Sequence, residues 1–203
     1  MVESSISSRI IQLQGSVAPI FCYLTYSAYP RKSGQPGVAD FVFGNPQDMP
    51  LPEFVKALQR WVVPRNKDWF AYKRNEPQAQ KVVAECLRQS RNLPFEPEDI
   101  FLTNGAFAAL GVTLAAIVDP GDEVIFVSPP WFFYEFYIAA SGAVPVRVRI
   151  DPQTFDLDLA AIQAVITPRT RAVLINSPNN PTGKIYPLST LTIDFYYGKL
   201  SVH

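Results

Sequence analysis

The fold of this chain is decided by a stretch in which an apolar strand runs into a polar turn, AVLINSPNNPTG at residues 172–183. Its first part, residues 172–176, has the short apolar run of a buried strand. Its second part, residues 177–183, contains the Pro, Asn and Gly residues that are typical of a turn. Open α/β sheets bind ligands just beyond the carboxyl ends of their strands. The stretch therefore predicts an α/β fold with a ligand site at this turn.

The sequence before this stretch alternates between strand and helix patterns from residue 99 onward. We expect strands at residues 100–103, 123–127, 144–150 and 172–176, and helices at residues 106–118, 131–140 and 157–165. Nearer the N-terminus the patterns predict helices at residues 4–15, 52–63 and 77–91, and a short strand at residues 38–43. Helix-length connections between strands imply crossovers and hence a parallel sheet.

Three turns follow predicted strands and contain residue types that suit a ligand. TNGAF at residues 103–107 begins a helix, whose free N–H groups can bind a phosphate. SPPWFFY at residues 128–134 brings aromatic rings that can stack on a flat heterocycle. Residues 176–183 bring asparagine amides that can donate to a ring oxygen. Taken singly, each has an ordinary explanation as a turn or as core packing, but together they favour a flat, phosphorylated cofactor.

Residues 36–187 resemble the N-terminal half of the class I/II aminotransferases, which are fold type I enzymes that use pyridoxal 5′-phosphate (PLP). The motifs that carry the resemblance, in the family's order, are TNGAF, DPGDEV at residues 119–124, TPRTR at residues 167–171 and SPNNPTG at residues 177–183. The resemblance implies an incomplete large domain with a parallel sheet and crossover helices. The implied divisions are an N-terminal arm and small-domain segment at residues 1–50, a partial PLP-binding large domain at residues 51–187 and an atypical tail at residues 188–203.

The resemblance also assigns cofactor contacts to particular residues. The backbone of Gly105, Ala106 and Phe107 matches the positions that meet the PLP phosphate. Trp131 matches the aromatic residue that stacks on the pyridine ring. Asn180 matches the asparagine that is hydrogen-bonded to the ring hydroxyl oxygen. The implied substrates are an amino acid and a 2-oxo acid.

Two further residues match the family's site, and several of its residues are missing. Tyr72 matches the tyrosine that reaches the phosphate of the neighbouring subunit's cofactor, which implies a homodimer. Gly44 matches a segment that lines the pocket for the substrate carboxylate. The family's cofactor-binding lysine, its Asp and Tyr beside the pyridine ring and its carboxylate-binding arginine have no counterpart, so no residue is assigned as catalytic. We expect a truncated chain that binds PLP weakly and does not transaminate by itself.

Composition argues against several other functions. The chain has 203 residues, and its 18 Lys+Arg balance its 18 Asp+Glu, so neither nucleic acid nor a membrane surface is an expected partner. Its single histidine, His203, argues against a histidine triad or metal site. The N-terminus lacks a signal-peptide pattern, so a cytoplasmic location is expected. Cys22 and Cys86 are expected to be buried, reduced thiols.

Two alternatives to an aminotransferase are open at this stage. A carbon–sulfur lyase, an aminocyclopropane-carboxylate synthase or a decarboxylase of the same fold would share the PLP contacts and differ in the substrate pocket. A non-catalytic fragment that acts by binding a partner is the alternative from another class. In either case, uncovered strand edges and apolar faces predict that the isolated chain associates or is poorly soluble.

Overall fold

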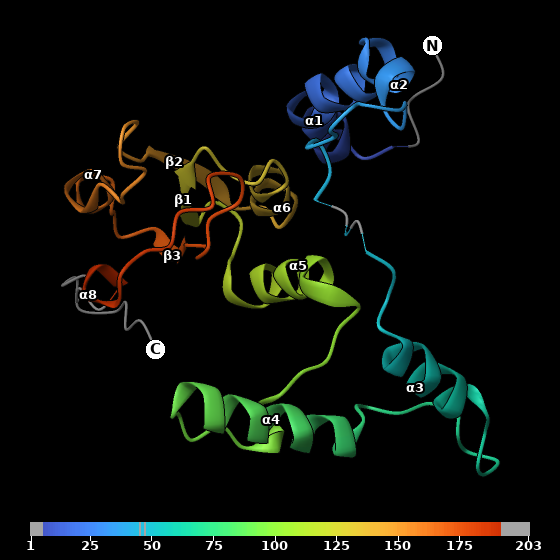
Figure 1. The fold of residues 1–203 in the computed structure, drawn as a ribbon. Helices are drawn as coiled ribbons and strands as arrows, with labels where there is room; N and C mark the ends of the chain where they lie inside the picture. The colour runs from blue at the N-terminus through green and yellow to red at the C-terminus, as the bar shows by residue number, and fades with distance from the viewer. Residues whose placement is uncertain (1–5, 45, 47, 192–203) are drawn as a thin grey trace. The chain divides into compact units, whose positions relative to one another are not determined.

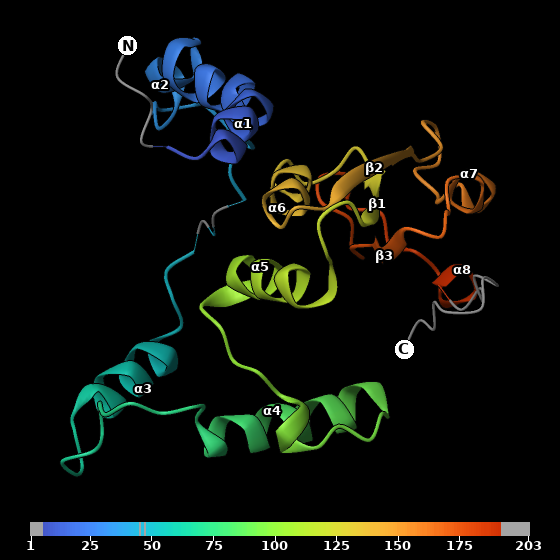
Figure 2. The same ribbon diagram turned by 180° about the vertical axis from the view of Figure 1, so that it is seen from behind.

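The computed structural model describes residues 6–44, 46 and 48–191 of the chain. These residues fall into two compact units, of which the first combines Met1–Pro30 with Ala106–His203 and the second is Arg31–Gly105. Figures 1 and 2 show the elements of both units from opposite sides. The domain boundaries predicted at residues 50 and 187 follow from the family resemblance, and they stay a prediction.

The first unit is built on a three-stranded sheet in the order β2-β1-β3, with both strand pairs parallel. Its strands are β1 (Glu123–Ser128), β2 (Val144–Arg149) and β3 (Thr170–Leu174). In the central strand, Ile125 pairs with Val146 of β2 on one side and with Val173 of β3 on the other. A strand that is buried on both faces is typical of a parallel sheet, and residues 123–127 are all buried. The predicted α/β class and parallel sheet are confirmed.

One face of this sheet is covered by α5 and α6. The helices that follow the second unit along the chain are α5 (Gly105–Ile117), α6 (Tyr134–Ala140), α7 (Leu159–Ala164) and α8 (Leu188–Leu191). Successive side chains of a strand point to opposite faces, so Val124 and Phe126 of β1 lie on the same side. They form a buried cluster with Leu114 of α5 and Ile138 of α6. This cluster sets the position of the start of α5, which is a predicted site element.

The opposite face of the sheet is covered by α7. Ile125 and Val127 of β1 pack there in a second buried cluster with Ile162 of α7 and with Tyr186. The sheet lies between α6 and α7 in both views (Figures 1 and 2). The Asp158 carboxylate caps α7 by accepting a hydrogen bond from the Ala161 N–H at 2.9 Å. The unit therefore has the helix–sheet–helix layers of an α/β domain.

The N-terminal helix α1 (Ser8–Tyr26) also belongs to the first unit and packs against α6. The Ser7 hydroxyl caps its start by accepting a hydrogen bond from the Ile10 N–H at 3.3 Å. The helix runs beyond the predicted end at residue 15 and contains Pro19, because packing against α6 and the burial of Leu13 offset the cost of an internal proline. The short helix α2 (Tyr29–Lys32) follows it. None of the described helices has the length and apolar character needed to cross a membrane.

A polar network joins the start of β1 to the loop before β3. The buried Glu123 carboxylate accepts hydrogen bonds from the Thr167 hydroxyl at 2.5 Å and from the Arg169 guanidinium at 2.6 and 3.0 Å. The Thr170 hydroxyl donates to the same carboxylate at 3.3 Å. The hydroxyl of Thr167, followed by the guanidinium of Arg169, holds the pKa of Glu123 below its ordinary value. The network pins the register where Glu123 pairs with Thr170.

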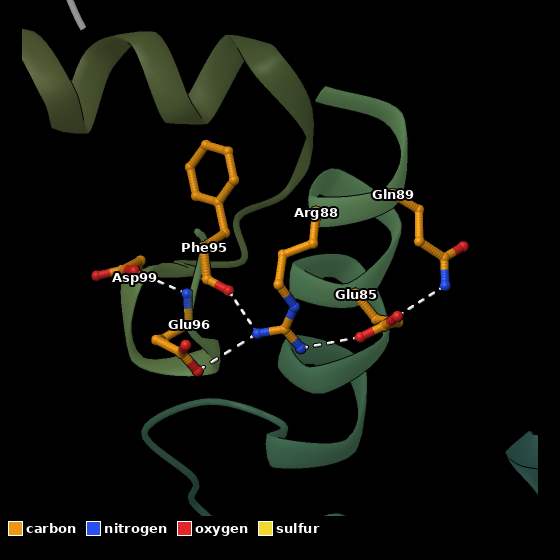
Figure 3. A network of polar contacts seen from close by, with 6 residues as sticks. All are labelled: Glu85, Arg88, Gln89, Phe95, Glu96 and Asp99. Carbon is orange, nitrogen blue, oxygen red and sulfur yellow. Dashed lines mark hydrogen bonds and ion pairs between the residues drawn. The ribbon is translucent and has the colours of Figure 1, made fainter. Parts of the chain in front are cut away.

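The second unit consists of helices joined by irregular segments. Its elements are α3 (Pro52–Val62), α4 (Pro77–Arg91) and the short 3-10 helix η1 (Pro97–Asp99). Arg88 of α4 donates to the Phe95 carbonyl oxygen at 2.6 Å and to the Glu96 carboxylate at 3.3 Å (Figure 3). It also donates to Glu85 on its own helix at 2.9 Å. These contacts hold the segment that enters η1 against α4, and the helices predicted at residues 52–63 and 77–91 are confirmed.

Two predicted strands are wrong, and both lie in the second unit. Residues 38–43 are irregular, and residues 100–103 belong to none of the described strands. A strand gains its stability from the ladder and the side-chain pairs on its neighbours, and no described strand pairs with either segment. Phe101 is therefore exposed. Among the described residues of this unit, only Ala84 and Ile100 are buried.

Two smaller expectations also need correction. The helix predicted at residues 131–140 begins only at Tyr134, after a turn that contains Trp131. Cys22 and Cys86 are free, but both are exposed rather than buried. Cys86 lies on α4, one helical turn from Val82, an apolar side chain that is also exposed. The apolar stripe of α4 therefore has little cover within the described chain.

Candidate functional site

The carboxyl edge of the sheet brings together two of the predicted site segments. β1 ends at Ser128 and β3 ends at Leu174, and the two strands are parallel neighbours. The loops that contain Trp131 and Asn180 follow these two strand ends, so both loops leave the sheet at the same edge. This is the edge at which α/β sheets bind ligands.

The start of α5 lies at the same edge, because the ring of Phe107 contacts the ring of Trp131 at a centroid distance of 5.5 Å. Gly105, the first residue of α5, has a φ of +81°, which favours glycine, and nothing lies within 4 Å of the position that a Cβ would take. The Thr103 hydroxyl donates to the Gly105 carbonyl oxygen at 2.9 Å, and the Gly105 N–H donates to the Thr103 carbonyl oxygen at 2.8 Å. The first N–H groups of a helix have no intrahelical partner and carry partial positive charge. The geometry therefore leaves room for an anion at this helix start.

Trp131 is partly buried against the cluster beneath α5 and α6. Its neighbouring rings meet the indole at steep angles, 83° for Phe107, 71° for Tyr134 and 64° for Phe133. The ring of Phe132 is tilted by 45°. In the part of the chain that the structure describes, no aromatic ring is stacked parallel on this indole. A flat ligand ring therefore meets no aromatic competitor for a stacked position on Trp131.

The two adjacent asparagines of the turn at residues 177–183 have different surroundings. Asn179 is buried, and its backbone N–H donates to the Lys184 carbonyl oxygen at 2.8 Å while its carbonyl oxygen accepts from the Gly183 N–H at 2.7 Å. Its side-chain amide donates to the Thr182 hydroxyl at 2.9 Å. Asn180 is exposed. Asn179 therefore closes the turn, and the side chain of Asn180 is the one that is accessible to a ligand.

An ion pair and a buried tyrosine anchor the end of this turn. Lys184 Nζ lies 2.6 Å from Asp156 Oδ1, and this contact is the main reason why the pKa of Asp156 lies below its ordinary value. The Tyr186 N–H donates to the Ser177 hydroxyl at 3.0 Å, which closes the loop across its base. Burial raises the pKa of the Tyr186 hydroxyl. The anchoring roles of Asn179, Lys184 and Asp156 were not predicted, because the pairing of residues 156 and 184 has no local sequence signal.

The other two predicted site residues, Tyr72 and Gly44, belong to the second unit. Both are exposed. Nothing in the structure of either unit tests their predicted contacts with cofactor or substrate, so these contacts stay predictions.

The second unit also contains a groove of 1080 Å³ between α3 and α4. Trp61 and Trp69 stack at its side with a centroid distance of 5.8 Å and an angle of 6° between their planes. The Arg65 guanidinium lies 4.1 Å from the centroid of Trp61. The two indole rings stack on each other and the guanidinium makes a cation–π contact with Trp61. Local packing therefore explains this arrangement.

Comparison with known proteins identifies what the chain is similar to. Residues 36–193 match the family model described as aminotransferase class I and II.

The described residues contain no group of three or more His, Cys, Asp or Glu side chains that could hold a metal ion.

Two curated relatives and one solved structure illustrate the similarity. A probable aspartate/prephenate aminotransferase of Thermus aquaticus is 40% identical over 145 residues, which are 71% of this chain and 38% of the relative. A probable aspartate/prephenate aminotransferase of Aquifex aeolicus is 32% identical over 187 residues, which are 91% of this chain and 46% of the relative. The structure of aspartate aminotransferase from Thermus thermophilus with maleate superimposes with a TM-score of 0.73 at 34% identity, and covers 93% of this chain and 48% of that one. The chain thus spans less than half the length of each.

Proposed function

Because the chain belongs to the class I and II aminotransferase family, we propose that it serves the transfer of an amino group between an amino acid and a 2-oxo acid with PLP as cofactor. The observation that carries this proposal is the convergence at one sheet edge of the open start of α5, the indole of Trp131 and the turn that contains Asn180. The proposal thus rests on the site as well as on the fold, which matters because one fold serves many reactions.

The residues present fit the three chemical parts of PLP. The backbone of Gly105, Ala106 and Phe107 at the start of α5 would line the phosphate, because a helix start favours an anion and Gly105 leaves space for it. The N–H groups of Ala106 and Phe107 would donate to it, since the Gly105 N–H already donates to the Thr103 carbonyl oxygen. Trp131 would stack on the pyridine ring, since no other ring in the described chain occupies the parallel position. The exposed amide of Asn180 would donate to the ring oxygen.

When bound, PLP supplies an electron sink for charge that develops on the substrate. The proposed task of this chain's own residues is to bind and orient that group. Trp131 would exclude water from one face of the ring, and Asn179 would keep the Asn180 side chain accessible by closing the turn beneath it. We assign no proton-transferring residue in this chain.

We propose aspartate as the first amino donor to test and prephenate as the first 2-oxo acceptor, because the relatives from Thermus and Aquifex are named for these compounds. Tyr72 and Gly44 are proposed as the phosphate contact across a homodimer and as a lining residue of the substrate pocket. The cytoplasm stays the proposed location. The matched proteins are named as aminotransferases, which favours amino transfer over the other PLP reactions.

The proposal is tested by binding of pyridoxamine 5′-phosphate to the purified chain. This compound has the ring, ring oxygen and phosphate of PLP but no aldehyde, so it does not react with surface lysines. We expect one molecule bound per chain by isothermal titration. Trp131→Leu and Asn180→Ala should each weaken binding by about 2- to 10-fold, as is typical for the loss of one ring stack or one hydrogen bond.

The matched control is Gln163→Ala, which also removes an amide. Gln163 is exposed on α7, which covers the other face of the sheet. It should bind pyridoxamine 5′-phosphate like the unmodified chain. Absence of binding, or equal weakening by Gln163→Ala and Asn180→Ala, would contradict the proposed site.

A further inference from the structure

We infer that the side chain of Phe107 is a positioning residue, which holds the indole of Trp131 in the orientation that a stacked ligand ring requires. The role of Trp131 rests on the proposed function, but the positioning of its ring by Phe107 does not. The family resemblance assigns a role only to the backbone of Phe107 and none to its side chain.

The inference starts from a closed cluster of three rings, Phe107, Trp131 and Phe133. Their centroids are 5.5 Å apart for Phe107 and Trp131, and 5.2 Å apart for each of the other two pairs. The angles between the planes are 83°, 79° and 64°. Edge-to-face contacts in this range of distances are favourable and directional. Each ring of the cluster is therefore oriented by the other two.

Phe107 is itself held in place by α6. Its ring meets that of Tyr137 at 4.7 Å and 84°. The Tyr137 ring in turn lies so close to α5 that a Cβ added at Gly111 would be 3.0 Å from its Cε1 atom. This closeness leaves little space for the Tyr137 ring to move toward α5, so the ring supports Phe107 from the side of α6. The orientation of Trp131 is thereby tied to the packing of α5 against α6.

Core packing alone does not explain Phe107. Its side chain is 45% exposed, so the ring contributes less to the buried core than a typical aromatic residue. The position of Phe107 gives a better explanation of the residue, because Phe107 provides both a backbone N–H at the open start of α5 and a ring that contacts Trp131. Phe107 thus links the part of the site suited to an anion with the part suited to a flat ring.

The test uses a chain in which Trp131 is the single tryptophan. Trp61→Phe and Trp69→Phe remove the other two, which lie in the second unit. In this background, Phe107→Leu removes the ring, Phe107→Tyr restores one, and Phe136→Leu is the matched control. Phe136 contacts the rings of Phe133 and Tyr137, but within the described residues it has no ring contact with Phe107 or Trp131.

Two readouts are measured: near-ultraviolet circular dichroism with fluorescence anisotropy of Trp131, and the affinity for pyridoxamine 5′-phosphate. We expect Phe107→Leu to lower the anisotropy and to weaken binding by about 3- to 10-fold. Phe107→Tyr should restore both. Phe136→Leu should change both less than Phe107→Leu does, because Phe136 reaches Trp131 only through Phe133 and Tyr137. Far-ultraviolet circular dichroism should be the same for all variants, which separates a loose indole from a loss of fold.

An unchanged Trp131 anisotropy in Phe107→Leu would overturn the inference, and so would an equal effect of Phe136→Leu. If Phe107→Leu does not fold, Phe133→Leu removes another member of the ring cluster and should lower the anisotropy of Trp131 in the same way. An unchanged anisotropy in Phe133→Leu would then overturn the inference. If the unmodified chain binds no pyridoxamine 5′-phosphate, the proposed function fails, while the anisotropy still decides the role of Phe107.

Discussion

Replacing Glu123 by Gln tests how the sheet of the first unit is held in register. The substitution keeps the shape of the side chain and removes its charge. The carboxylate accepts hydrogen bonds from Thr167, Thr170 and, through two nitrogens, Arg169. Both Arg169 nitrogens donate to one carboxylate oxygen, and both threonine hydroxyls donate to the other. Gln has only one acceptor oxygen and an NH₂ group, so it cannot accept from Arg169 and from the threonine hydroxyls at the same time.

The size of the effect follows from the burial of the two partners. Glu123 is 6% exposed, while the side chain of Arg169 is 71% exposed, so solvent screens the pair from one side. A hydrogen bond to a charged group contributes about 1.5–3 kcal/mol, and exposed ion pairs contribute about 0–1 kcal/mol. We therefore expect Glu123→Gln to lower the free energy of unfolding by roughly 1–2 kcal/mol at pH 7.

The pH dependence has a definite sign. The pKa of Glu123 is lowered in the folded state, first by Thr167 and then by Arg169. Folding therefore favours the charged carboxylate, whose contribution is full above the ordinary Glu pKa of about 4.3 and is lost as the pH falls through the lowered folded pKa. The difference between the unmodified chain and Glu123→Gln should be constant near pH 7 and should shrink below about pH 4.

Urea unfolding at pH 7 and pH 3, with amide hydrogen exchange in β1 and β3, measures this difference. The control is Glu135→Gln, because Glu135 also pairs with an arginine, Arg147, but both side chains are substantially exposed. The control should cost about 0–1 kcal/mol. Equal stability of Glu123→Gln and the unmodified chain at pH 7, or a difference that grows toward pH 3, would refute the reasoning.

Further predictions concern two helix glycines and a helix cap. Gly15→Ala in α1 should raise the free energy of unfolding by about 0.5–1 kcal/mol in thermal denaturation, because nothing lies within 4 Å of the added Cβ. Gly111→Ala should instead lower it by roughly 1 kcal/mol, because the added Cβ would lie 3.0 Å from the Tyr137 ring; equal gains at both glycines would be evidence against close packing of α5 on α6. Asp158→Ala should cost about 1 kcal/mol in urea unfolding, since the carboxylate accepts from the Ala161 N–H; no loss would show that α7 does not depend on this cap.

Much of the first unit could be predicted because its signals are local. The runs at residues 123–127, 144–150 and 172–176 are apolar and end in turns, and each contains most of an observed strand. The run at residues 100–103 has the same character, yet it forms no described strand. Its apolar composition fits a buried strand, but a strand also needs a neighbour to pair with, and no local pattern shows whether one is present.

Of the segment predicted as atypical, residues 188–203, only α8 lies within the described residues. The predicted tendency to associate stays a prediction, although exposed apolar side chains such as Phe101, Val112 and Tyr72 agree with its premise. Sedimentation of the purified chain would decide it.

The sequence by itself determined the α/β class, the parallel direction of the strands and the turns at which we propose that a ligand binds, because apolar periodicity and Pro/Asn/Gly punctuation are properties of neighbouring residues. Only the tertiary structure decided which residue of each turn is buried as an anchor and which is exposed to a ligand. It buries Asn179 and exposes Asn180, although the two are adjacent and chemically identical. It also places the ring of Phe107 against Trp131, 24 residues away along the chain. Such assignments depend on contacts between distant segments, which form only when the helices pack on the sheet.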